Sequence, residues 1–144
     1  MVKVLVASRN QGKVRELEQV LRELNIEGVE LVSLHDAPPY PDPVEDGLTF
    51  VDNALLKARA GAKATGLPCV ADDSGLSVKA LNGMPGILSA RWSGNHGDDQ
   101  ANNELLLAQM ADINERAAAF VSCCALAAPD GQEFTAEGLS LIHI

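Results

Sequence analysis

The stretch that organises this sequence is Val70-Ala71-Asp72-Asp73-Ser74-Gly75-Leu76, in which two adjacent carboxylates follow a short apolar run. Neighbouring side chains of an extended strand point to opposite faces, so Asp72 and Asp73 cannot both reach the same ligand there. We expect one carboxylate to face a cleft and the other to brace the local backbone. An acidic pair at the end of an apolar strand can hold a hard cation such as Mg²⁺. Taken alone, Asp-Asp-Ser-Gly is more typical of a turn with solvated carboxylates.

A second candidate site lies near the N-terminus, where the apolar run Val2–Ala7 predicts a buried strand. A polar loop over residues 8–13 follows, and then a helix with one apolar stripe made of Val14, Leu17, Leu21 and Leu24. The free amides and positive dipole at a helix start favour an anion, and Lys13 is unfavourable there unless an anion lies beside it. The loop has only one glycine and Val14 follows the lysine, so it is not a Walker A loop. An ordinary strand-to-helix connection remains the alternative.

The middle of the chain carries further polar candidates. Residues 35–47 hold most of the prolines and several acids, which predicts a surface loop, either a plain connection or a lid carrying ligands. Thr49 is a suitable N-cap for a helix that ends at Gly66. Asn53 and Lys57 are four residues apart on one face of that helix, and a solvated stripe is the favoured interpretation of this pair.

The remaining segments alternate between strand and helix patterns, which favours a layered α/β domain with hairpins at its edges. We expect a strand at 29–34, a strand or helical turn at 76–81, and a helix capped by Asp98 or Asp99. The apolar run 117–128 predicts a long strand, which a turn joins to residues 133–137 as a hairpin.

Composition limits the function classes. The chain has 144 residues, 47% hydrophobic and 3% aromatic, which suits one domain with an aliphatic core. Its formal net charge of −9 argues against non-specific binding to nucleic acid. The sequence shows no bilayer-spanning apolar run and no signal peptide, so we expect no membrane partner. The cysteines lack metal-site spacing and predict reduced core thiols of a cytoplasmic protein; they are Cys69, Cys123 and Cys124.

The candidates together suggest metal-assisted attack on a phosphoanhydride. A cation that bridges phosphate oxygens and a carboxylate that binds it or orients water are what this reaction requires. The sequence offers the 8–13 loop for phosphates, the acidic pair, Glu45 on the proline-rich loop, and two cations, Lys57 and Arg91.

The same segments resemble the inosine/xanthosine triphosphate pyrophosphatases, which remove non-standard purine nucleoside triphosphates. The resemblance lies in Ser8–Lys13, Glu45–Phe50 with Asn53-Ala54, Leu56–Ala58, Ala71–Leu76, and Gly83–Gly86 leading to Ser89–Arg91. It implies a two-lobed ITPase-like α/β fold with a long mixed sheet and a central cleft. It also implies a cytoplasmic, Mg²⁺-dependent homodimer that hydrolyses dITP, ITP or XTP to the monophosphate and pyrophosphate.

The resemblance further implies a role for each matching residue. Asp73 would be the catalytic carboxylate, acting as proton acceptor and Mg²⁺ ligand, and Asp72 would support the site. Glu45 would assist the metal, with Asp42 as a weaker candidate. The contacts to the substrate would come from Ser8, Arg9, Asn10, Gln11, Gly12, Lys13, Lys57 and Ser74.

Two other functions fit the same residues: a nucleotide-binding module that has lost hydrolysis, and a pyrophosphatase for modified pyrimidine triphosphates. The resemblance runs through Glu137-Gly138 and then stops, so we expect a partial ITPase-like domain at 1–138. Residues 139–144 are expected to be a non-native tail, because they back-translate to a transposon end sequence used as a library adaptor. Expressed alone, the chain is expected to be poorly soluble, with an unpaired strand edge, and without ITP hydrolysis.

Overall fold

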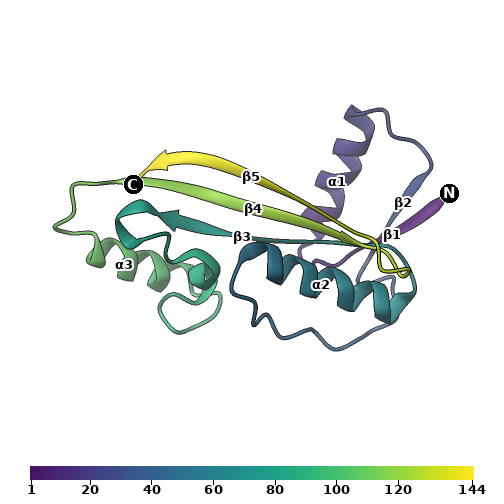
Figure 1. The fold of residues 1–144 in the computed structure, drawn as a ribbon, viewed down its shortest axis with the longest axis horizontal. Coiled ribbons are helices and arrows are strands. Elements are labelled where there is room, and N and C mark those ends of the chain that lie inside the picture. The colour runs from purple at the N-terminus through teal and green to yellow at the C-terminus, as the bar shows by residue number, and fades with distance from the viewer.

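The computed structural model describes residues 1–144 as a five-stranded mixed sheet with the strand order β2-β1-β3-β4-β5 (Figure 1). β1 pairs in parallel with β2 and β3, whereas β3–β4 and β4–β5 are antiparallel. The predicted α/β class with a long mixed sheet is confirmed. The elements are β1 Val2–Val6, α1 Gln11–Glu23, β2 Val29–Ser33, α2 Phe50–Thr65, β3 Cys69–Val78, η1 Lys79–Leu81, η2 Gly86–Arg91, α3 Asp99–Gln109, β4 Ala117–Ala127 and β5 Glu133–His143.

The helix boundaries follow from local capping chemistry. Asn10 caps α1 by accepting the amide of Gly12, and Thr49 caps α2 by accepting the amide of Asp52. α2 ends at Gly66, whose φ of 70° is left-handed. Of the two predicted caps of α3, Asp98 is the one used, and it accepts the amide of Ala101. None of the helices combines the length and apolar character that a membrane crossing requires.

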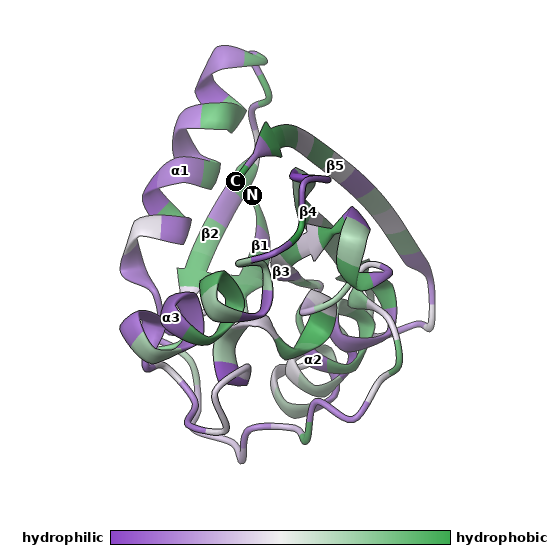
Figure 2. Cartoon of the chain, turned by 90° about the vertical axis from the view of Figure 1, so that its left-hand side faces the viewer, coloured by the Kyte–Doolittle hydropathy of each residue, from purple (hydrophilic) through white to green (hydrophobic).

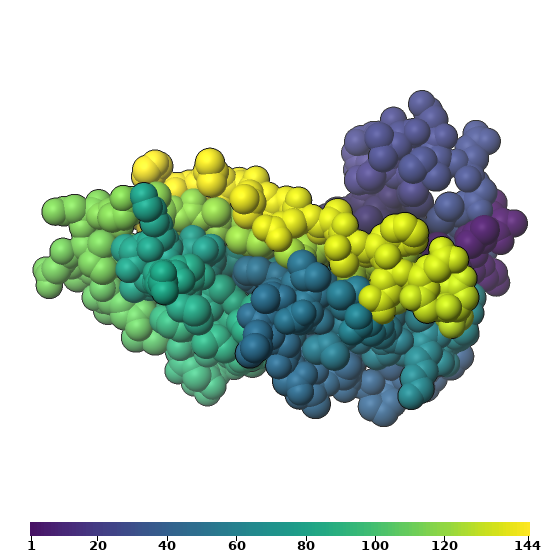
Figure 3. Space-filling view, viewed as in Figure 1, coloured from purple at the N-terminus to yellow at the C-terminus, as the bar shows by residue number.

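The unequal lengths of the strands position the site. β1 pairs with β3 only at Leu5 and Val6, opposite Cys69 and Val70, while β3, β4 and β5 continue as a long three-stranded ribbon. From Asp72 onward, one edge of β3 is therefore free of strand partners, next to the loop that leaves β1. Figure 1 shows α1 and β2 at one end of this ribbon and α3 at the other, and Figure 3 shows α1 projecting from the elongated molecule.

Small side chains bring α2 close to one face of the sheet. A side chain at Gly61 would put its Cβ 2.4 Å from the sulfur of Cys69, so the helix can approach only because this position is a glycine. The core beneath α2 consists of Leu5, Ala54, Ala58, Ala62, Cys69, Ala71, Ala125 and Ala127, and a second core beside α3 consists of Val78, Leu106, Met110 and Ala118.

The α1 helix lies against the other face of the sheet and is much less covered. Its predicted apolar stripe is only partly covered: Val14, Leu17 and Leu21 are half-buried, no residue of α1 is buried, and Leu24 is 64% exposed. The outer strand β5 also has no buried residue, and apolar and polar side chains alternate along it (Figure 2). Its Phe134, Leu139 and Leu141 are exposed.

Several local expectations were wrong. Asp-Asp-Ser-Gly forms no turn, because β3 runs unbroken from Cys69 to Val78 and pairs with β4 at every residue. Gly75 serves a close approach instead: a Cβ there would lie 2.6 Å from the carbonyl oxygen of Gly86. Residues 76–81 satisfy both predicted options, strand and then a helical turn.

Two further expectations need correction near the C-terminus of the described chain. The hairpin strand does not stop at Glu137, because β5 stays paired with β4 as far as His143. Cys124 is exposed and is not a core thiol, whereas Cys69 and Cys123 are buried and free. Burial raises the pKa of Cys69 to about 12.

Candidate active site

The predicted phosphate loop lies where β1 ends and α1 begins. Within it, Ser8 Oγ accepts the amide of Asn10 at 3.1 Å, and Asn10 Oδ1 accepts the amide of Gly12 at 2.9 Å. These bonds fix the loop around the start of α1, where amide groups and the helix dipole favour negative charge. Gln11 is the first residue of α1; it is exposed and lines a shallow pocket with Leu31 and Ser33 of β2, away from the acidic pair.

The anion beside Lys13 is Asp72. Lys13 Nζ lies 2.9 Å from Asp72 Oδ2, and the Asp72 carboxylate raises the pKa of Lys13 against the opposing effect of partial burial. This ion pair compensates the unfavourable placement of a cation at a helix N-terminus. Asp72 therefore faces α1, and its supporting role in the site stays a prediction.

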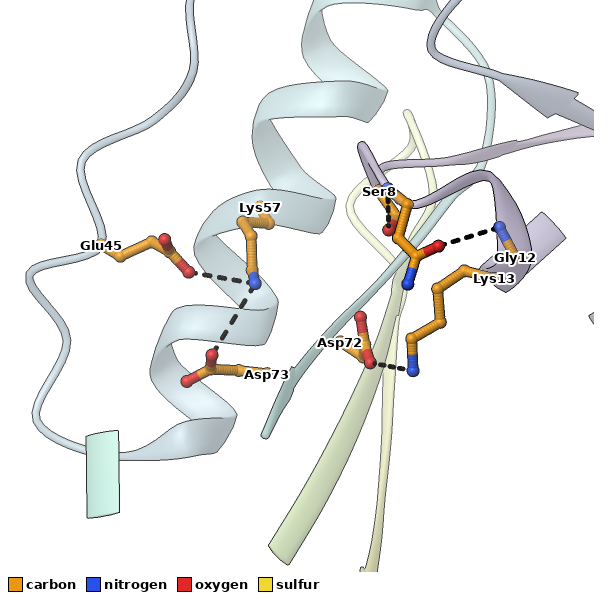
Figure 4. A network of polar contacts seen from close by, with 8 residues as sticks. Ser8, Gly12, Lys13, Glu45, Lys57, Asp72 and Asp73 are labelled. Carbon is orange, nitrogen blue, oxygen red and sulfur yellow. Dashed lines mark hydrogen bonds and ion pairs between the residues drawn. The ribbon is translucent and has the colours of Figure 1, made fainter. Parts of the chain in front are cut away.

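Asp73 points to the opposite face of the sheet, as the alternation of strand side chains requires (Figure 4). There, Lys57 of α2 places its ammonium 3.0 Å from Glu45 Oε1 and 3.8 Å from Asp73 Oδ1. Burial raises the pKa of Asp73; Lys57 acts in the opposite direction and Glu45 adds to the increase. The second oxygen of Asp73, Oδ2, is buried and has no hydrogen-bond partner.

Asn53 holds the proline-rich loop in place. It is only 2% exposed, and its Oδ1 accepts the amide of Gly47 at 2.8 Å. A Cβ at Gly47 would lie 2.6 Å from that same oxygen, so the contact requires a glycine. The interpretation of Asn53 and Lys57 as a solvated stripe is wrong: the first is buried, and the second is half-buried among carboxylates. The predicted cap at Thr49 fixes where the helix begins and therefore places Asn53 and Lys57 on one face. This spacing was the sequence signal for both residues.

The proline-rich loop closes one side of a polar pocket of about 380 Å³. Arg9 of the phosphate loop forms an ion pair with Asp42 across the mouth of this pocket. The lining combines residues from the two loops, α2, β3 and the turn before α3; its polar members are Ser8, Arg9, Tyr40, Asp42, Glu45, Lys57, Asp72 and His96. His96 was not predicted to take part, and nothing in its sequence context indicates that it would.

A larger groove of about 890 Å³ begins at Lys13 and Ser74 and runs along the face of β3, β4 and β5 towards α3. Phe120 and Trp92 contribute aromatic surface to it. Ser74 therefore shares this groove with Lys13 of the phosphate loop, and its predicted contact with substrate stays a prediction. Arg91 is exposed and forms no ion pair with the site carboxylates, so it does not bridge the acidic site.

The site thus combines a helix N-terminus, two lysines and three carboxylates around one edge of β3. This combination defines an α/β protein suited to binding a polyphosphate, since cations and free amides hold phosphates while carboxylates can hold a metal or a water. A family model described as the Ham1 family matches residues 4–140, and the chain belongs to this family.

Curated relatives and solved structures agree with this assignment. A dITP/XTP pyrophosphatase of Corynebacterium efficiens is 65% identical over 139 residues, which cover 95% of this chain and 67% of that protein. The crystal structure of a nucleoside-triphosphatase / dITP/XTP pyrophosphatase of Mycobacterium abscessus is 60% identical, with a TM-score of 0.89 over 99% of this chain and 74% of that one. The Staphylococcus aureus Ham1 protein is 37% identical, with a TM-score of 0.88 and coverages of 99% and 71%.

Proposed function

We propose that this protein is a hydrolase of nucleotide metabolism that converts non-standard purine nucleoside triphosphates (dITP, ITP and XTP) to the monophosphate and pyrophosphate. One water is consumed, and the phosphoanhydride between the α- and β-phosphates is broken. The family and the names of its most similar relatives support this substrate class. The geometric observation that carries the proposal is the meeting of Lys57, Glu45 and Asp73 beside the phosphate loop.

Each residue has a chemical task in the proposed reaction. Ser8, Asn10 and the amides at the start of α1 hold phosphate oxygens, and Arg9 and Lys13 neutralise their charge. Lys57 neutralises a further phosphate, and Ser74 contacts the substrate from the groove. Asp73 accepts the proton of the attacking water.

We propose Mg²⁺ as the cofactor, and the residues fit this cation. The unpartnered oxygen of Asp73 and the adjacent Glu45 offer two carboxylates, although no group of three or more acidic, histidine or cysteine side chains forms a complete cage. Mg²⁺ suits such a sparse site because it is usually bound by one or two carboxylates together with substrate phosphates and water. When bound, it neutralises the charge that develops on the phosphates.

The cellular setting is part of the same proposal. We propose a cytoplasmic homodimer that acts on a small nucleotide without a membrane or nucleic-acid partner, and the net charge of −9 supports the absence of a nucleic-acid partner. Residues 1–138 form the pyrophosphatase domain in this proposal, and the origin of residues 139–144 remains a prediction. Resequencing the locus without the adaptor tests that origin, and recovery of the same six codons would contradict it.

A panel of nucleoside triphosphates tests the function. The chain spans 67% of the Corynebacterium efficiens relative, so a chimera of residues 1–138 with the remaining part of that relative is assayed beside the 144-residue chain. We expect Mg²⁺-dependent pyrophosphate release by the chimera from ITP and XTP, well above release from ATP or GTP. A folded chimera that binds ITP without releasing pyrophosphate would favour the binding module. Preference for a modified TTP would favour the pyrimidine enzyme.

A further inference from the structure

Lys57 lies between the two carboxylates that the proposed function assigns to a metal. Its ammonium is within ion-pair distance of Glu45 and of Asp73 at once. We propose that Lys57 is an internal counter-ion that holds the metal position in the ligand-free protein, so that a divalent cation binds there only by displacing the ammonium group. This inference rests on the proposed function, because that function makes Glu45 and Asp73 metal ligands.

The three groups come from separate elements, which makes their meeting a property of the tertiary fold. Glu45 belongs to the loop that Asn53 fastens to α2, Lys57 to α2 itself, and Asp73 to β3. The exposed side-chain fractions are 23% for Lys57, 36% for Glu45 and 17% for Asp73. At this degree of burial, the attraction between the charges is screened less than at the open surface.

The charge count decides whether lysine and metal can share the position. Two carboxylates and one ammonium leave a net charge of −1, and exchange of the ammonium for a divalent cation makes the sum zero. Both cations together would face each other at close range with like charge, which is strongly unfavourable in a partly buried site. The ammonium also leaves Asp73 Oδ2 without a partner, so the lysine only partly satisfies the carboxylate that a metal could bind.

The lysine on the other face of β3 provides an internal contrast. Lys13 contacts a single carboxylate, that of Asp72, and the charges of this pair already balance. A divalent cation that replaced Lys13 would meet only one carboxylate, so its binding would be less favourable than at Glu45 and Asp73. A displaced Lys57 is free to pair with a phosphate of the substrate, so one side chain would connect metal binding to triphosphate binding.

Titration of the 144-residue chain with Mn²⁺ tests the inference. Calorimetry at pH 8 compares Lys57→Met with Lys63→Met, which removes the same charge from an exposed position on the same helix. We expect Lys57→Met to bind Mn²⁺ about three- to tenfold more tightly than the wild type, as loss of a partly buried competing ion pair predicts. Lys63→Met should stay within about twofold. Equal or weaker binding by Lys57→Met than by Lys63→Met overturns the inference, as does absence of binding in all three proteins.

A second measurement uses the wild-type chain and covers the case in which Lys57→Met does not fold. Crystals are soaked with Mn²⁺, and anomalous scattering locates the ion. An ion on Glu45 and Asp73 with the Lys57 ammonium turned away supports the inference, whereas an ion there with both ion pairs retained overturns it. Neither measurement uses hydrolysis, so a failed pyrophosphate assay bears on the proposed function and leaves this test intact.

Discussion

At the level of single residues, the opposite orientation of Asp72 and Asp73 divides the site into two charge clusters. One carboxylate pairs with Lys13 on the α1 side, and the other meets Lys57 and Glu45 on the α2 side. Because the backbone between them is one extended strand, both clusters are held in a fixed relation to each other. A triphosphate that reaches both lysines would have to lie across the free edge of β3.

Asp73→Asn is the sharpest single substitution on the α2 side. In the chimera, we expect turnover of ITP to fall about 10²- to 10⁴-fold, because the amide cannot accept the proton of water. Folding should be retained, since the change removes a partly buried charge with an unpartnered oxygen. Steady-state kinetics and a thermal melt measure the two effects. Asp46→Asn, on the exposed position beside Glu45, is the control, and near-normal turnover in Asp73→Asn would transfer the role to Asp72.

Lys13→Ala tests the phosphate loop. We expect weaker binding of ITP to the 144-residue chain, by about fivefold or more, because a cation at the start of α1 is lost from the phosphate-binding surface. Calorimetry without Mg²⁺ gives the affinity directly. Lys3→Ala removes an equal charge from an exposed position on β1 and should have little effect. Unchanged affinity in Lys13→Ala would mean that the lysine serves only as the partner of Asp72.

At the level of elements, the contact between α2 and the proline-rich loop determines where Glu45 lies. Asn53→Ala leaves the amide of Gly47 without its acceptor, which should lower the free energy of unfolding by about 1–3 kcal/mol. The loop should also lose its position, so that Mn²⁺ binding weakens. Urea unfolding and calorimetry measure both effects, with the exposed Asn103→Ala as the control. Lowered stability with unchanged Mn²⁺ affinity would show that Asn53 does not contribute to metal binding.

Local signals predicted the elements better than they predicted the site. The caps Thr49 and Gly66 stand where the sequence placed them, because capping depends only on neighbouring residues. The need for a glycine at position 75 could not be predicted in this way. It arises from the carbonyl oxygen of Gly86, which only the folded chain brings close to Gly75. Asn53 was named as a candidate, but its burial and its contact with Gly47 also depend on the folded chain. Pairing with β4 also overrides the local turn preference of Asp-Asp-Ser-Gly.

The family resemblance predicted more of the site than single motifs did. It linked the 8–13 loop, Glu45, Lys57 and the acidic pair before any contact was known, and the structure brings these segments together. It did not predict that Lys13 and Lys57 would each form ion pairs with carboxylates of the site. That arrangement depends on side-chain distances, which neither a motif nor its order in the chain contains.

At the level of the whole molecule, the outer edge of β5 should govern association in solution. The strand is 11 residues long, none of them buried, and its unpaired backbone groups can accept another strand. We expect concentration-dependent self-association, measured by light scattering after size-exclusion chromatography. Leu141→Lys should reduce it, because an edge lysine opposes strand pairing, whereas Leu107→Lys on α3 removes an exposed leucine elsewhere and should not. Equal association in both variants would exclude the β5 edge.

Because successive side chains of β3 point to opposite faces, the number of residues before the acidic pair determines which face each carboxylate occupies. An insertion or deletion of one residue between Cys69 and Asp72 would exchange the sides on which the two carboxylates lie. Asp73 would then point away from α2, and its lysine would lose a partner although every residue was still present. A change by two residues would keep each acid on its own side. Insertions or deletions in this part of the strand therefore preserve the site only when they change its length by an even number of residues. The site depends on the length of the strand as well as on its residue types.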